Sequence, residues 1–281
     1  MVAHGFVPVV GIGGSAAVIV LATRSKLMMI AVLGIVLAAS FVAERIAPYE
    51  PIWNRSHRDR LRDAAHAVVN ESSTALGVLA MPSIVGVVPH VSRWPAGLPF
   101  PVQVLASVVV LDLGITFVHW RSHRYTWLWR FHAVHHSVGR MYGFNGLVKH
   151  PVHQAIETGA GMLPLVAFAI PGDVAAAVAG LVIIQLVLQH SNVDYVVGRT
   201  ASRWFALNSG HRLHHVRRVP EGDVNFGLFL LVWDRMFGTF VEPASVEVRA
   251  GELGIAERPD YPVGYRAQLR EPFSRRWSTN G

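Results

Sequence analysis

The sequence contains no cysteine among its 281 residues. This absence excludes disulfide bonds, cysteine-ligated zinc, iron–sulfur clusters and thiolate-bound haem within the chain. A metal ion bound by this chain must therefore take its protein ligands from histidine, aspartate or glutamate. Histidine is plentiful by contrast: the chain has 15, and 11 of them lie between His119 and His215.

Charged residues are also scarce. They make up 15% of the chain, against roughly 25% in an average soluble domain, while 52% of the residues are hydrophobic and the mean hydropathy is +0.36. The deficit indicates that much of the surface faces lipid. No stretch has the composition of a linker, and no internal repeat is evident, so one membrane-embedded unit is predicted.

The net charge of +7 raises the question of nucleic acid binding. The arginines, however, stand beside apolar runs, as do Arg55, Arg58, Arg60 and Arg62. Basic residues in that position are typical of segments that flank membrane spans and contact anionic headgroups. We therefore expect the membrane and a lipid substrate as partners, and no nucleic acid.

Six apolar runs set the expected architecture: Val7–Ala22, Leu27–Ala47, Val68–Val91, Phe100–Trp120, Ala155–Ile170 and Val174–Gln189. A bilayer core is crossed by about 20 helical residues, so the first four runs predict about four transmembrane helices. The last two flank Pro171, Gly172 and Asp173 and predict a shallow hairpin. The expected fold is all-α and integral to the membrane, with a cytosolic helical cap that carries a di-metal histidine site.

The polar segments between these runs indicate the orientation in the membrane. Nearly all the arginines lie in residues 48–62, 121–154 and 191–281. If these segments share one side, the positive-inside rule makes that side cytoplasmic. Arg24 and Lys26 then lie on the opposite side, against the rule. In this arrangement every histidine cluster lies at the cytoplasmic face.

Three histidine motifs follow one another along the chain. HWRSH ends an apolar helix, and HAVHH and HRLHH each place imidazoles at positions i, i+3 and i+4, which share one helix face. Eight imidazoles exceed what one metal ion can use and suit two. Imidazole binds zinc, copper and iron, so the ligand type leaves the metal open. These candidate ligands are His119, His123, His132, His135, His136, His211, His214 and His215.

Other polar residues stand close to these motifs. His190 ends an apolar run in QHSN and is either a further ligand or a structural histidine. Asp112 lies two turns before His119 on an apolar helix, where a carboxylate is costly unless it is paired. It is expected to orient a ligand imidazole or to form an interhelical salt link. His150 is expected to orient a ligand, and the role of His153 is left open.

The ordered motifs HWRSH, HAVHHS, QHSN, HRLHH, DVNFG and WDRMFGTF resemble the fatty acid hydroxylase superfamily, also called the sterol desaturase family. The resemblance covers about residues 112–240. Two positions depart from the family pattern: Trp120 stands between His119 and Arg121, and His153 stands where glutamate is common. The resemblance divides the chain into an N-terminal transmembrane region (1–111), a catalytic domain (112–240) and a C-terminal cytosolic tail (241–281).

The resemblance implies a di-iron centre, isolated in some members with zinc, that activates O2 as co-substrate beneath a lipid-access channel. It carries the eight motif histidines over as metal ligands and adds His190 as a ninth. It also matches His150, Asn145 and Asn225 to recurring family positions beside the metal site. The implied activity is a monooxygenase-type oxidoreductase that hydroxylates or desaturates a fatty acyl chain, a sterol or a polar lipid.

Turnover of such a centre needs electrons, and the chain has no flavin or nicotinamide motif. A separate electron donor is therefore expected, either a reductase, a ferredoxin or a cytochrome b5-like protein. The main alternative is a zinc-dependent membrane hydrolase or another redox-inactive metalloenzyme. A haem electron carrier would need paired histidines within the bilayer, and a metal transporter would need ionisable residues in several spans. The motifs lie in polar segments, which disfavours the haem carrier, and the apolar runs contain few ionisable residues besides Asp112, which disfavours the transporter.

Overall fold

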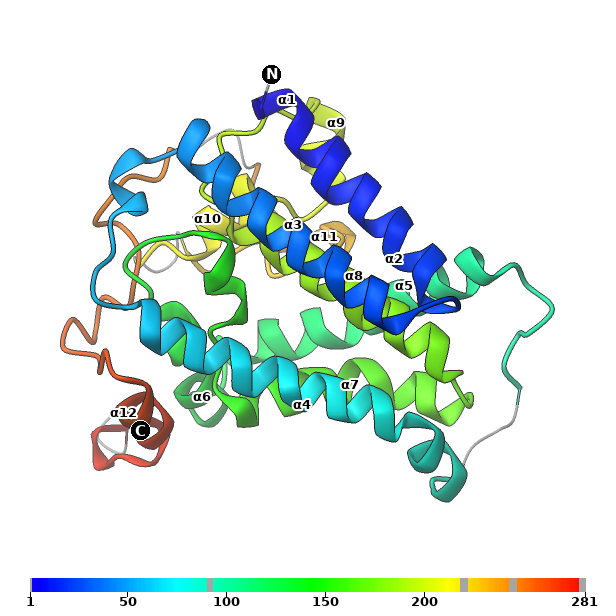
Figure 1. Ribbon diagram of the computed structural model, residues 1–281. Coiled ribbons are helices and arrows are strands. Elements are labelled where there is room, and N and C mark those ends of the chain that lie inside the picture. The colour runs from blue at the N-terminus through cyan, green and yellow to red at the C-terminus, as the bar shows by residue number, and fades with distance from the viewer. Residues whose placement is uncertain (1, 90–92, 218–221, 243–246, 278–281) are drawn as a thin grey trace.

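The computed structural model describes residues 2–89, 93–217, 222–242 and 247–277, which are built from helices and connecting loops (Figure 1). The longer helices are α3 (Lys26–Ile46), α4 (Arg60–Val87), α5 (Phe100–Ser122), α6 (Thr126–His136), α7 (Pro151–Ala167) and α8 (Gly172–His190). The shorter ones are α1 (Val2–Phe6), η1 (Val7–Gly13), α2 (Gly14–Ala22), η2 (Pro51–Asn54), η3 (Gly143–Leu147), α9 (Arg199–Trp204), α10 (Asn208–His214), α11 (Val232–Phe237), α12 (Tyr265–Arg270), η5 (Glu271–Phe273) and η6 (Arg275–Trp277). The described residues form isolated β-bridges but no strand, which confirms the all-α prediction.

Five helices are long and apolar enough to cross a membrane, one more than expected: His4–Ala22, Lys26–Ile46, Arg60–Val87, Phe100–Ser122 and Gly172–His190. The additional one is α8, the second arm of the hairpin that the sequence analysis takes to be shallow. Its 19 residues are apolar on every side, a pattern typical of a helix that is surrounded by protein. The chain is therefore an integral membrane protein in which the second arm of the hairpin is also long and apolar enough to cross the membrane.

Helix α8 forms the centre of the bundle, where it packs against α2, α3, α4 and α5. In Figure 1 it runs diagonally behind α3. Val178, Leu181 and Ile184 are almost fully buried on it. A Cβ atom at Gly180 would lie 2.8 Å from Val18 Cγ1, so glycine allows α2 to approach α8 this closely. His190, the last residue of α8, is thereby held at a fixed position at one end of the bundle.

Two glycines bring α5 and α7 into backbone contact. A Cβ atom at Gly114 would lie 2.5 Å from the carbonyl oxygen of Ala160, and one at Gly161 would lie 2.9 Å from the carbonyl oxygen of Leu111. No larger residue fits there without moving a main chain, which is how small residues act at membrane-helix interfaces. The contact fixes the last turn of α5, with His119, beside the first turns of α7.

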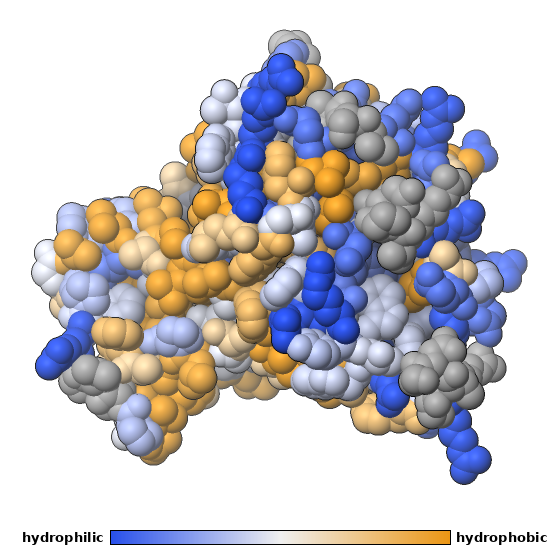
Figure 2. Space-filling view, turned by 180° about the vertical axis from the view of Figure 1, so that it is seen from behind, coloured by the Kyte–Doolittle hydropathy of each residue, from blue (hydrophilic) through white to orange (hydrophobic). Residues whose placement is uncertain are grey.

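The polar segments meet at one end of the bundle, as the orientation argument requires. The Arg140 side chain donates to Asp59 with a 2.6 Å Nε–Oδ2 distance, and the His66 and Gln268 side chains are 2.9 Å apart. Figure 2 shows apolar residues gathered over one part of the surface and hydrophilic residues over another. At the opposite end of the bundle Lys26 forms an ion pair with Asp173, which neutralises its charge.

Candidate metal centre

Nine histidines converge at the polar end of the bundle from four separate helices. They come from the end of α5, from α6, from the end of α8 and from α10, where i, i+3 and i+4 spacing turns the rings of one motif to one side. All are buried except His123, whose side chain keeps 9% of its exposure. The structure thus brings the three histidine motifs and His190 together.

The nine rings form two groups, and within each group the nearest ring nitrogens lie within 4.8 Å of one another. The first group contains His119, His123, His132, His136 and His214, and the second contains His135, His190, His211 and His215. Adjacent residues of one motif are divided between the groups, as His135 and His136 are. Each HxxHH motif therefore contributes to both groups and ties them together.

In the first group the Nε2 atoms face one another across short distances. His119 Nε2 lies 2.9 Å from His214 Nε2, and His136 Nε2 lies 3.0 Å from that of His132 and 3.1 Å from that of His123. Nitrogen ligands lie about 2.0–2.1 Å from a zinc ion, which sets the ligands of one such ion about 3 Å apart. The observed separations match that spacing.

The second group, with one ring from α6, one from α8 and two from α10 and its end, repeats this arrangement. His211 Nε2 lies 2.9 Å from His190 Nε2 and 3.1 Å from His215 Nε2. His190 Nε2 in turn lies 3.3 Å from His135 Nε2. His190 is thus an integral member of this group, and the sequence alone does not distinguish that position from a structural one.

Main-chain carbonyls fix the tautomers of four of these rings. The Nδ1 atom of His119 donates to the carbonyl of Phe226 and that of His214 to the carbonyl of Val224, each at 2.8 Å. His135 and His190 make the same kind of bond to carbonyl oxygens on Val148 and Leu186. With the proton on Nδ1, each Nε2 presents a lone pair.

The lone pairs of facing Nε2 atoms indicate whether the histidines fit a metal ion. In the pair of His119 and His214, both Nδ1 atoms are committed as donors, so no proton is left to join the two Nε2 atoms 2.9 Å apart. Burial also lowers the pKa of His214 well below its usual value, which keeps the ring neutral. The same burial effect acts on His135, His136, His211 and His215. Two neutral acceptors at this distance fit a cation between them.

Asp112 binds the segment that follows Val224 and Phe226, whose carbonyls hold His214 and His119. Its carboxylate accepts hydrogen bonds from the backbone of Phe229 at 2.8 Å, the backbone of Leu230 at 3.0 Å and the indole of Trp233 at 2.8 Å. The structure therefore places Asp112 against main chain and indole donors. It reaches the histidines indirectly, by fixing the segment from which Phe226 projects.

Asn225 and Asp234 also stabilise this segment through hydrogen bonds. Asn225 has a φ angle of 53°, a conformation that asparagine adopts more readily than most residues, and its side chain makes two hydrogen bonds to the backbone of Val241. Asp234 accepts from the backbone of Phe226 and Gly227. Asp234 is not among the site residues predicted from the sequence, although a carboxylate within the aromatic run WDRMFGTF could have indicated its role.

Asn145 and His150 lie outside the two groups. The side-chain Oδ1 atom of Asn145 accepts a hydrogen bond from the backbone N–H of Tyr142 at the start of η3. In η3, a Cβ atom added to Gly146 would lie 2.9 Å from His190 Nδ1. His150 caps the N-terminus of α7, where its Nδ1 accepts a hydrogen bond from the backbone N–H of Val152. Its Nε2 donates to the carbonyl of Leu269. His150 makes no ring contact with a group member among the described residues.

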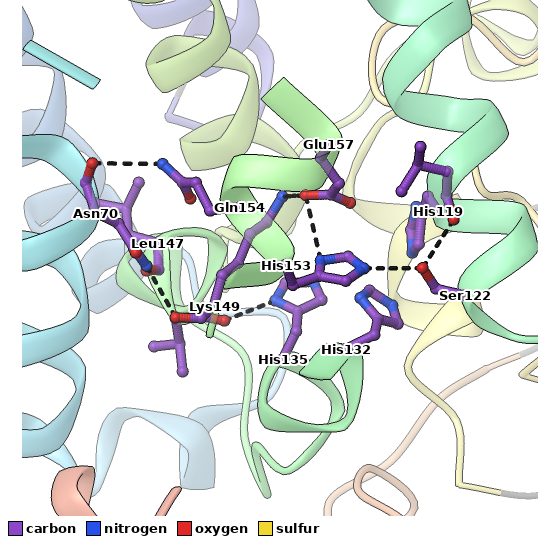
Figure 3. A network of polar contacts seen from close by, with 12 residues as sticks. Asn70, His119, Ser122, His132, His135, Leu147, Lys149, His153, Gln154 and Glu157 are labelled. Atoms are coloured by element: carbon purple, nitrogen blue, oxygen red, sulfur yellow. Dashed lines mark hydrogen bonds and ion pairs between the residues drawn. The ribbon is translucent and has the colours of Figure 1, made fainter. Parts of the chain in front are cut away.

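His153 lies against the first group, as Figure 3 shows. Its ring centroid is 4.5 Å from that of His132, its Nε2 is 2.8 Å from Ser122 Oγ, and its Nδ1 is 3.6 Å from Glu157 Oε2. Lys149 Nζ donates to the same Glu157 oxygen at 2.6 Å. The residue that departs from the family pattern is therefore joined to a buried ion pair beside the histidines.

Two cavities adjoin each other beside the histidine groups. A small one is lined by members of both groups, including His119 and His190. A larger one of about 440 Å³ lies between α4, α5, α7 and α8, and its wall is mostly apolar. Both cavities are lined by Ile115, Lys149, Glu157, Leu186 and Leu228. The arrangement gives a lipid-sized space one end at the candidate metal site.

The chain is similar in sequence to a known protein family and to several known proteins. The fatty acid hydroxylase family matches residues 104–239. The chain is 31% identical over 243 residues to ornithine lipid hydroxylase OlsE of Rhizobium tropici, covering 83% of this chain and 72% of the relative. Alkylglycerol monooxygenases are 32% identical in Danio rerio and 30% in Homo sapiens, over 50% and 46% of this chain but only 31% and 28% of their own length. No solved structure matches the chain significantly.

Proposed function

The chain belongs to the fatty acid hydroxylase family, and from this membership we propose that it is an O2-dependent di-iron oxygenase that hydroxylates a polar lipid at the membrane. Hydroxylation is favoured over desaturation because the relatives are named hydroxylases and monooxygenases. In this reaction one oxygen atom of O2 enters a C–H bond of the lipid, and the other leaves as water with two electrons from a separate donor and two protons from the solvent.

The single observation that carries the proposal is the set of facing Nε2 atoms. Two groups of buried, neutral imidazoles present lone pairs to one another at about the spacing that metal ligands adopt. We assign the nine histidines as the ligands of two iron ions. Iron supplies, when bound, the redox chemistry of oxygen activation, which amino-acid side chains do not supply themselves.

The residues of the chain then act in distinct ways. Carbonyls of Val148, Leu186, Val224 and Phe226 hold four ligand rings in one tautomer and orientation. Asp112, Asn225 and Asp234 hold the loop that supplies two of these carbonyls. Burial of the rings excludes water from the site, and the adjoining cavity receives the lipid.

The larger cavity supports a lipid substrate and indicates which end of it reacts. Lys149 and Glu157, two of its polar lining residues, also line the small cavity at the histidines. Ile84 at the apolar end lies 13 positions beyond Glu71 on α4, a distance of about 20 Å along a helix. A lipid in this cavity would extend its chain away from the site, so oxidation would occur at or near the headgroup.

We further propose that the histidine end faces the cytoplasm. Arg55, Arg58 and Arg60 lie at this end, and at the other end the charge of Lys26 is offset by Asp173. A cytosolic or membrane-bound reductase, ferredoxin or cytochrome b5-like protein would then reach the site from that side.

The decisive experiment combines metal content with oxygen incorporation. The parent protein, purified in mild detergent from iron-supplemented cells, should hold about two irons, one for each histidine group. His214→Ala and His211→Ala should each lose about one, while the double variant His135→Ala, His214→Ala loses most of both. His57→Ala, which removes an exposed histidine, is the matched control.

The second half of this experiment supplies ¹⁸O2, a chemical reductant and membrane lipids, with ornithine lipid tested first because of the relative's name. A hydroxylated lipid carrying ¹⁸O, absent from the double variant, is the expected result. Lipid cleavage without O2 would instead favour the zinc hydrolase. A folded parent protein that binds no metal would refute the assignment of the ligands.

A further inference from the structure

The polar end of the larger cavity is lined by more negatively charged residues than positively charged ones. The charged residues that line it are Glu71, Lys149 and Glu157. Lys149 and Glu157 form a 2.6 Å ion pair, which leaves the carboxylate of Glu71 as the excess charge. In the described part of the chain no hydrogen bond or ion pair holds this carboxylate, although the Lys149 ammonium exerts a field on it.

Glu71 also lies where a carboxylate is costly. It stands on α4, one of the helices able to cross a membrane, and is partly buried. An ionisable residue within such a span is retained when it serves a site or a partner. Because it lines a cavity of about 440 Å³ that borders the histidine groups, its partner is expected inside that cavity.

Asn70, the preceding residue, offers a second and independent acceptor. It is 1% exposed and lines the same cavity, and its Oδ1 atom is buried without a hydrogen-bond partner among the described residues. Its Nδ2 atom donates to the carbonyls of Leu147 at 3.1 Å and Lys149 at 2.9 Å. These two bonds fix the orientation of the amide, so the unpartnered atom is the acceptor oxygen.

The carboxylate of Glu71 and the buried amide oxygen of Asn70 line the same cavity, and neither has a hydrogen-bond donor as partner among the described residues. A primary ammonium group has three N–H donors, no acceptor and one positive charge. We propose that this end of the cavity binds the primary ammonium group of a lipid headgroup, held by Glu71 and Asn70. The inference rests on the proposed function only for the chemistry at the neighbouring histidines.

The remaining wall of the cavity specifies that the ammonium belongs to a lipid. Beyond Glu71 the lining residues of α4 include Val78, Met81 and Ile84, and α8 adds Val178 and Val182. A small water-soluble amine would leave this apolar surface empty, whereas a chain attached to the ammonium group would cover it. The headgroup amine would then lie beside Lys149 and Glu157, which also line the small cavity at the histidines.

The test measures binding, so it does not depend on turnover. Native mass spectrometry of the metal-loaded protein in detergent would titrate tetradecylamine, its N-acetylated form and tetradecyltrimethylammonium. The parent should bind the primary amine about tenfold more tightly than the acetamide, with the quaternary ion, which keeps the charge but has no N–H donor, in between. Butylamine, which lacks the chain, should bind more weakly than all three.

Glu71→Gln should lower the affinity for tetradecylamine about tenfold and leave that for the acetamide unchanged. Glu257→Gln, which removes an exposed carboxylate outside the cavity, should bind all three lipids like the parent. Equal affinities for the amine and the acetamide in the parent, or an equal loss of both in Glu71→Gln, would overturn the inference. Amine selectivity without any O2-dependent product would leave it standing and refute the proposed function instead.

Discussion

His119 and His214 lie 95 positions apart in the sequence, yet their Nε2 atoms are 2.9 Å apart. Their Nδ1 atoms donate to the carbonyls of Phe226 and Val224, the two neighbours of Asn225. One turn of the chain therefore orients a ring from α5 and a ring from α10. The pairing depends on this turn as much as on the two helices.

Asn225 is consequently a position at which a residue that touches no metal should control metal binding. Asn225→Val places a β-branched residue at a φ of 53° and removes both bonds to Val241, so the carbonyls beside it should turn away. We expect metal affinity to fall about 10- to 100-fold. Asn225→Gly keeps the backbone conformation and should lose less. Metal retained during dialysis against a chelator measures both, and equal retention by the two variants would contradict the argument.

How far the sequence predicts this site depends on the kind of contact. The spacing within HAVHH and HRLHH predicts which rings share a helix face, and the structure brings all of them together. Spacing cannot predict that neighbours such as His135 and His136 belong to different groups, because that depends on how α6 packs against α5 and α7 while α10 packs against α8. Two partners of Asp112 are backbone N–H groups more than 100 positions away, and no side-chain pattern in the sequence indicates such contacts.

The larger cavity shows the same limit for the fold. The hydropathy of Val174–Gln189 predicts an apolar helix but not that it forms the centre of the bundle, since length and composition are the same for a shallow arm. The predicted boundary between an N-terminal region and a catalytic domain at residue 111 stays a prediction. Residues of α4, which precede this boundary, line the larger cavity together with residues that follow it. The roles proposed for Glu71 and Asn70 depend on their lack of hydrogen-bond partners for the carboxylate and the amide oxygen, which the sequence does not show.

The contact between α5 and α7 should be intolerant of any side chain at Gly114. An added Cβ atom would lie 2.5 Å from the main-chain oxygen of Ala160, so Gly114→Ala has to push the helices apart. We expect a loss of about 1–3 kcal/mol in the free energy of unfolding, seen as a lower thermal midpoint in detergent. Gly34→Ala, on α3 with open space around it, should be neutral or stabilising. Similar midpoints for the two variants would show that the helices are not in backbone contact.

The link between Asp59 and Arg140 should make stability depend on acid pH. Burial alone would raise the pKa of Asp59, but the Arg140 guanidinium overrides it and lowers that pKa from 3.8 to about 2. A lowered folded-state pKa means that the interaction stabilises fully above the unfolded value and is lost as pH falls toward about 2. Asp59→Asn should therefore unfold at a lower temperature than the parent near neutral pH, with a gap that narrows below about pH 4. A gap that stays constant from neutral pH into that range would mean that the charge of Asp59 contributes nothing.

The assignment of the larger cavity to the lipid chain makes a prediction about chain length. Ala179 lines the cavity on α8, seven positions before Leu186, which borders the histidines, so a side chain added there stands about 10 Å from the polar end. Ala179→Phe should weaken binding of long-chain lipids several-fold and spare short-chain ones, with metal content unchanged because no ligand moves. Leu163→Phe enlarges an exposed residue of α7 that does not line the cavity, and it should leave the dependence on chain length as in the parent. If Ala179→Phe weakens binding of short and long chains alike, the chain does not extend along α8, and the headgroup rather than the chain would have to occupy this space.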